Sequence, residues 1–162
     1  MRRVAAEFLG TLFLLAAVVG SGIMGERLAG GNVALALLAN TAATGAALVA
    51  ILLAFGPISG AHLNPAVTLA ELWMGGISRR DALGYTAAQV CGAFAGVAVV
   101  HMMFGLAVVQ VSTRARSGPA QWLSEYVATF GLIWSDRVNS AHSGVVLVVV
   151  VAFVLSRRQS EQ

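Results

Sequence analysis

The segment from Ser59 to Thr68 carries the residue types that could do chemistry in this chain. Asn64 stands directly before Pro65, as an N-cap stands before the first turn of a helix. A capping asparagine uses its side-chain oxygen for the helix amides, so its NH₂ stays free to donate to a passing oxygen. The half-positive end of a helix opposes cations. The backbone carbonyls of Gly60, Ala61 and His62 would add a ladder of acceptors, an arrangement that suits water or a small neutral solute rather than an ion.

The composition decides which kind of element must position these groups. Of the 162 residues, 58% are apolar and only 10% are charged, with a mean hydropathy of +0.82. A soluble domain has about 25% charged residues, so this chain cannot cover a water-facing surface. We therefore expect a multi-pass membrane protein in contact with lipid. A soluble enzyme, a nucleic-acid partner and a disulfide scaffold are excluded as classes, since the ten basic residues are paired or isolated arginines between apolar blocks and Cys91 is the single cysteine.

Apolar blocks and breaks predict the helices. We expect spanning helices at about 4–24, 32–55 and 82–113, because each block is long enough to cross a membrane. Residues 65–74 would form a helix of roughly 15 Å, about half of a hydrocarbon core. Residues 120–134 and 144–155 are short apolar segments. The predicted fold class is an all-α membrane protein with three spanning helices and one re-entrant half-helix, followed by one or two further short transmembrane segments.

Irregular backbone at membrane depth is tolerated only where protein buries it or where it lines a water-filled cavity. The glycine-containing stretch before Pro65 therefore predicts a cavity or a pore. A weak internal repeat aligns Glu7 and Thr11 with Glu125 and Thr129 at an offset of 118 residues. We accordingly expect a first unit at 1–113 and the start of a second unit at 114–162.

The sequence Ser-Gly-Ala-His-Leu-Asn-Pro-Ala-Val-Thr, with Ala-Glu-Phe-Leu-Gly-Thr near the start and Gly84-Tyr85 and Gln89 further on, resembles the aquaporin and aquaglyceroporin (major intrinsic protein) family. The resemblance implies six spanning helices in two inverted repeats, two half-helices that meet at the midplane, and tetramers in which each protomer has its own pore. It implies that Glu7 and Glu125 brace the half-helix loops. The pore-lining residues implied by the motif are Gly60, Ala61, His62, Asn64, Ala66 and Thr44, the last contributed by the second helix.

The chain departs from this family after its first half. No second Asn-Pro-Ala motif occurs, and the fifth and sixth helices are not recognisable. We expect a truncated channel subunit for water or small neutral solutes that needs oligomerisation to complete a pore. Water-selective relatives place an aromatic ring where Thr44 stands, so a wider opening for glycerol or undissociated metalloid acids is favoured. The alternative is a non-conducting subunit or remnant that associates with full-length channels.

Two oligomers remain open, a tetramer by resemblance and an antiparallel homodimer. Five crossings would place five arginines on each side of the membrane, which leaves orientation undecided. If the last segment does not cross, the count becomes seven against three, and the N-terminus lies in the cytoplasm of a bacterial-type inner membrane. We favour this fixed orientation. No catalytic residues, metal site or cofactor are expected, since His101 and His142 are isolated.

Overall fold

A computed structural model describes residues 1–110, together with 118–119, 122–123, 126–127 and 130–131. The described part contains four helices, which are α1 (Arg2–Leu28), α2 (Val33–Ser59), α3 (Pro65–Trp73) and α4 (Arg79–Met103). The short segments expected at 120–134 and 144–155 lie wholly or largely outside the described residues, as does Glu125.

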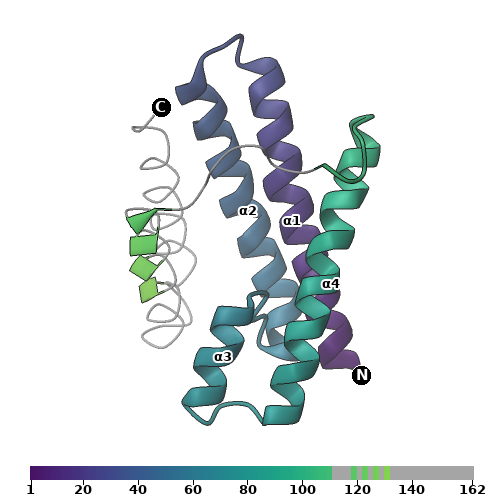
Figure 1. Ribbon diagram of the computed structural model, residues 1–162, viewed down its shortest axis with the longest axis vertical. Coiled ribbons are helices and arrows are strands. Elements are labelled where there is room, and N and C mark those ends of the chain that lie inside the picture. Colours follow the sequence, from purple (N-terminus) through teal and green to yellow (C-terminus); the bar gives the residue numbers. More distant parts are fainter. Residues whose placement is uncertain (111–117, 120–121, 124–125, 128–129, 132–162) are drawn as a thin grey trace.

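Three of these helices are long and apolar enough to cross a membrane. α1 and α2 each have 27 residues and α4 has 25, so they measure roughly 40 Å at 1.5 Å per residue. α3 has nine residues and reaches only about 14 Å, too little to cross. Figure 1 shows that α3 lies at the end of the bundle where α1 and α4 begin. The predicted all-α membrane fold with three spanning helices is confirmed.

The ends of α2 and α4 differ from those expected. α2 continues through Pro57 to Ser59 because the backbone hydrogen bonds resume after the proline, with Gly60 N donating to Gly56 O at 2.9 Å. The actual terminator is Gly60, whose left-handed φ of 88° is a C-cap conformation that glycine adopts without strain. α4 begins earlier than expected, at Arg79, because Ser78 Oγ accepts from Asp81 N as an N-cap.

α4 also ends earlier than the expected residue 113, at Met103. The backbone N–H of Phe104 bonds to Val100 O as the helix closes, and Gly105 then takes a positive φ of 67°. The uncharged run after this point is therefore not all one helix, because hydropathy marks apolar residues without marking where the backbone turns.

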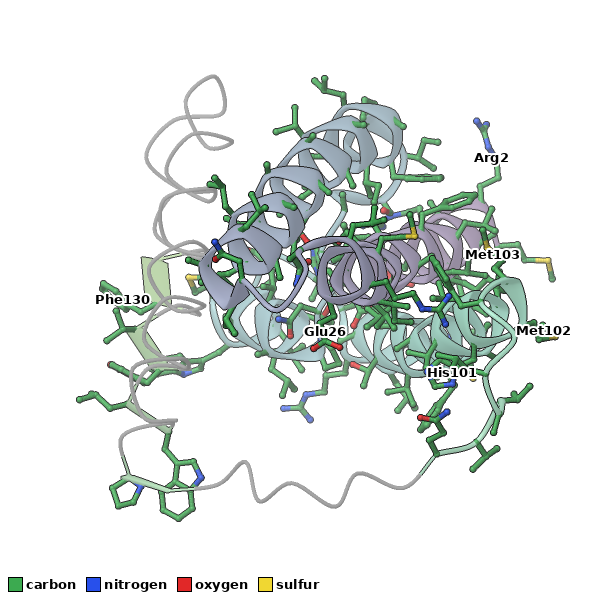
Figure 2. All side chains as sticks on the ribbon, turned by 90° about the horizontal axis from the view of Figure 1, so that it is seen from above. Arg2, Glu26, His101, Met102, Met103 and Phe130 are labelled. Carbon is green, nitrogen blue, oxygen red and sulfur yellow. The ribbon has the colours of Figure 1, made fainter. Side chains whose placement is uncertain are left out.

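α1 is the centre of the bundle. It packs against both α2 and α4, whereas α2 and α4 make no backbone-level contact with each other. The view along the bundle places α1 between them (Figure 2). Gly92 and Gly96 of α4 make the close approach possible, since a Cβ atom at either would overlap a backbone carbonyl oxygen of α1, that of Phe8 or Leu12. α2 and α4 consequently diverge on either side of α1 and leave space between them.

Candidate pore site

The loop between α2 and α3 has a backbone that must be held in place by its surroundings. Ala61 and Leu63 have positive φ angles of 47° and 52°, a region that non-glycine residues rarely occupy. Both side chains are buried, and Ala61 and Leu63 form a small apolar core with Ile51 of α2. This packing fixes the loop from the apolar side, and its buried amides need hydrogen-bond partners within the protein.

Glu7 supplies those hydrogen bonds from α1. Its carboxyl group is completely buried and accepts from four donors. Oε1 accepts from Ser59 Oγ at 2.5 Å and from His62 N at 3.0 Å, and Oε2 accepts from Leu63 N at 2.7 Å and from Gln89 Nε2 at 2.8 Å. One side chain on α1 thereby connects the end of α2, the loop and α4. This is the geometry that bracing of the half-helix loop requires.

α4 contributes two further buried polar residues to the same network. The Tyr85 hydroxyl donates to Ser59 O at 2.8 Å, and Gln89 Nε2 donates to Thr68 Oγ1 at 3.0 Å as well as to Glu7. In the described residues, no buried side-chain nitrogen or oxygen atom lacks a hydrogen-bond partner. Tyr85 and Gln89 were quoted only as part of the family resemblance, without a role, although two polar residues four positions apart in an apolar helix are a signal of an internal contact.

α3 begins at this braced loop, and its first turn presents Asn64. Asn64 Oδ1 accepts from Ala66 N at 2.8 Å, which is the N-cap arrangement, and Asn64 O accepts from Thr68 N at 3.0 Å. The Asn64 Nδ2 group has no hydrogen-bond partner among the described residues. A donor NH₂ therefore stands at the positive end of a half-helix and is half-buried.

A cavity of about 510 Å³ opens beside Asn64. Its walls come from α1, α2 and α4, and the 61–65 loop forms one end of it. The described residues do not enclose this cavity, which is open to its surroundings. The lining residues are Thr11, Leu14, Leu15, Val18, Thr44, Leu48, Leu52, Ala61, His62, Leu63, Asn64, Pro65, Gln89, Val90 and Ala93.

Residues 1–156 match the family described as "Major intrinsic protein". The chain belongs to the major intrinsic protein family. It is 56% identical over 132 residues to Aquaglyceroporin AqpS of Rhizobium meliloti, a match that covers 82% of this chain and 56% of that protein. It is also 34% identical over 168 residues to Glycerol uptake facilitator protein-like 6 of Lactiplantibacillus plantarum, which covers 96% of this chain and 74% of that protein.

A third relative, Aquaporin A of Dictyostelium discoideum, is 43% identical over 96 residues, 59% of this chain and 34% of that protein. The chain spans about half the length of most of the curated relatives it matches. Major intrinsic proteins are channels rather than enzymes. Family membership and three helices long and apolar enough to cross a membrane make this chain a multi-pass membrane protein.

The structure of this family member brings four of the predicted pore residues to one cavity. The cavity is lined by Thr44 of α2 and by three residues of the loop before α3, Ala61, His62 and Asn64. Gly60 and Ala66, also predicted to line a pore, are exposed and do not line this cavity. Glu125, predicted to brace a second loop, lies outside the described residues.

His62 is held by two neighbours. Its Nδ1 lies 3.1 Å from Thr68 Oγ1, and its ring meets the Tyr85 ring edge-on with centroids 5.2 Å apart. The ring thus has a structural environment even though His62 lines the cavity. No cluster of three metal-binding side chains occurs in the part of the chain that the structure describes.

Proposed function

We propose that this chain is an aquaporin-like channel subunit for the passive transport of water or small neutral solutes. The observation that carries the proposal is the unpartnered Asn64 NH₂ at the start of α3, beside a cavity between α2 and α4. A solute there exchanges water for the amide and for loop carbonyls, while the N-terminus of α3 disfavours cations. No bond is made or broken, so no catalytic residue, metal or cofactor is required.

The cavity wall supports a neutral polyol more than water alone. Thr44 is buried, lines the cavity and occupies little volume, and the neighbouring wall is apolar, with Leu48, Leu52 and Leu14. An apolar wall facing a few polar groups fits a solute that has carbon and hydroxyl faces. We therefore favour glycerol or an undissociated metalloid acid as the solute class.

Completing a pore from this cavity requires oligomerisation. α1, α2 and α4 form the walls of the cavity, and the described residues do not enclose it. A second subunit covers that side in our proposal, in a homo-oligomer that is either a tetramer or an antiparallel dimer. In a tetramer all chains would have the same orientation in the membrane, whereas in an antiparallel dimer the two chains would have opposite orientations.

The charges at the two ends of the bundle support one fixed orientation. Arg2 and Arg3 begin α1, and Arg79 and Arg80 begin α4, so four arginines lie at the end where α3 also lies. Arg27 lies at the opposite end of α1. By the positive-inside rule, the end with four arginines faces the cytoplasm, in a bacterial-type inner membrane.

Permeability measurements on proteoliposomes test the channel. Stopped-flow light scattering would record vesicle shrinkage under an osmotic step of sucrose and re-swelling with glycerol. We expect the purified chain to raise both rates above those of empty vesicles, and Asn64→Asp to reduce glycerol entry because it replaces the donating NH₂ with an oxygen.

Asn32→Asp is the matched control. Asn32 is also an N-cap, with Oδ1 accepting from Leu35 N at 3.1 Å, but it is exposed at the start of α2 and does not line the cavity. Aspartate caps a helix as well as asparagine does, so this variant should conduct as the wild type does. Wild-type vesicles no faster than empty ones would instead assign the chain to non-conducting subunits that associate with complete channels.

A further inference from the structure

Arginines are concentrated at the end of the bundle where α1 and α4 begin. Their side chains are exposed, and none of them makes an ion pair with a described residue. Two carboxylates, Glu71 of α3 and Asp81 of α4, belong to the same end, and Asp81 Oδ2 accepts from the Ser78 hydroxyl at 3.0 Å. Positive charge therefore remains in excess. The members of this basic patch are Arg2, Arg3, Arg79 and Arg80.

Helix packing makes one patch of the two arginine pairs. Val4 directly follows the pair on α1, and it packs against a buried cluster formed by Ile77, Ala82 and Tyr85. The pair on α4 lies between the first two members of that cluster in the sequence. Both pairs therefore border the same apolar cluster, and Arg2 extends away from the bundle (Figure 2).

Arg3 is ordered by an aromatic ring. Its guanidinium carbon lies 5.4 Å from the centroid of the Tyr85 ring, within the range of a cation–π contact. Tyr85 is itself fixed, because its hydroxyl donates to Ser59 O at 2.8 Å. A guanidinium presents its N–H donors in a planar fork that matches two phosphate oxygens. One member of the patch is thus held in place for a phosphate group.

Arginine at these positions does not help the helices themselves. The first turn of a helix is its positive end, which favours acidic side chains and disfavours basic ones. α1 nevertheless begins with two arginines and has no acidic residue in its first turn. An anion that is not part of the chain would offset this unfavourable placement.

The surface beside the patch is apolar, which favours a lipid over a water-soluble anion. Leu72 of α3 packs against the same buried cluster, and the next two residues, Trp73 and Met74, expose 92% and 45% of their surfaces. Tryptophan is enriched where membrane meets water, with its ring at the level of the lipid headgroups. Basic clusters beside membrane-spanning helices attract anionic headgroups at that level.

We propose that the basic patch binds the headgroup of an anionic phospholipid. The arginines donate hydrogen bonds to the lipid phosphate, and Trp73 lies at the boundary between headgroup and acyl chain. This inference does not depend on whether the chain conducts solutes, because the patch lies at the end of the bundle and none of its arginines lines the cavity.

Native mass spectrometry of the purified chain, released from detergent micelles, measures the binding. We expect dioleoyl phosphatidylglycerol to bind at least roughly tenfold more tightly than dioleoyl phosphatidylcholine, since each arginine near an anionic headgroup contributes about a factor of five. Arg80→Gln should lower the affinity for phosphatidylglycerol roughly fivefold. Arg79→Gln/Arg80→Gln should bring it close to the affinity for phosphatidylcholine.

Arg27→Gln is the matched control. Arg27 is exposed at the other end of α1, where it donates to Phe104 O at 3.2 Å, and its replacement should leave the affinity for phosphatidylglycerol unchanged. Arg79→Lys/Arg80→Lys keeps the charge and should keep most of the preference. Melting followed by circular dichroism checks that each variant is folded.

Three results would overturn the proposal. Equal affinities for the two lipids, or a preference that survives Arg79→Gln/Arg80→Gln, would leave the arginines with a role in orienting the chain alone. Displacement of phosphatidylglycerol by inorganic phosphate at equal concentration would assign the patch to a soluble anion. A loss of affinity that only accompanies a lower melting temperature would show that the arginines act on the fold.

Discussion

Replacing Glu7 should destabilise the protein by an amount that depends on how many loop amides lose their partner. The carboxyl group accepts from His62 N, Leu63 N, Ser59 Oγ and Gln89 Nε2, and it is completely buried. The two backbone amides cannot rotate to other partners because the loop is held by its packing. The hydroxyl and the amide side chain can reorient.

The contacts give different costs for two substitutions. In Glu7→Gln, the new NH₂ takes the place of one carboxyl oxygen, so either His62 N or Leu63 N faces a donor and stays unpaired. One unpaired buried amide costs about 1–3 kcal/mol of unfolding free energy. In Glu7→Ala both backbone amides lose their acceptor, so the cost is about 2–6 kcal/mol. The loss of unfolding free energy in Glu7→Ala should therefore be about twice the loss in Glu7→Gln.

Unfolding in detergent micelles, titrated with sodium dodecyl sulfate and followed by circular dichroism, measures these free energies. Glu26→Gln is the matched control, because Glu26 is exposed near the end of α1 at Leu28 and its replacement should change stability by less than about 0.5 kcal/mol. A Glu7→Ala protein as stable as the Glu26→Gln protein would refute the view that Glu7 holds the loop.

Two further predictions concern α4. Gly96→Leu should cost about 1–3 kcal/mol of unfolding free energy, because a side chain would collide with the Leu12 carbonyl of α1. Gly84→Ala is its control, since a Cβ there makes an ordinary contact; equal melting temperatures for the two variants would contradict the close-packing explanation. Tyr85→Phe should cost about 0.5–1.5 kcal/mol by removing the hydrogen bond to Ser59 O. The same titration measures it, and a variant as stable as the wild type would show that this bond contributes nothing.

Local chemistry let the sequence predict the half-helix and its cap. Proline suits the first turn of a helix and asparagine suits the N-cap, so the start of α3 at Pro65 was predictable from two residues. Hydropathy likewise predicted three spanning helices, because apolar length is a property of the chain itself. The helix ends were less predictable. The second helix was expected to end at about residue 55, but it continues through Pro57 to Ser59 and is capped by Gly60.

The sequence could not predict which residues hydrogen-bond to one another in the buried polar network around Glu7. Glu7 and Gln89 are 82 residues apart, and only the packing of α1 on α4 brings them within 2.8 Å. That packing depends on Gly92 and Gly96, where a Cβ atom would overlap a backbone oxygen of α1. Pairing of buried polar groups depends on distances in three dimensions, which no local pattern encodes.

By itself the sequence determined that the chain is a membrane protein and that Asn64 caps a short helix beginning at Pro65, since both follow from composition and from neighbouring residues. Only the tertiary structure decided which residues share the cavity. It placed Thr44 there with Asn64 and left Gly60 and Ala66 outside. The physical reason is that a helix face is oriented by the helices packed against it, and α1 packs against both α2 and α4.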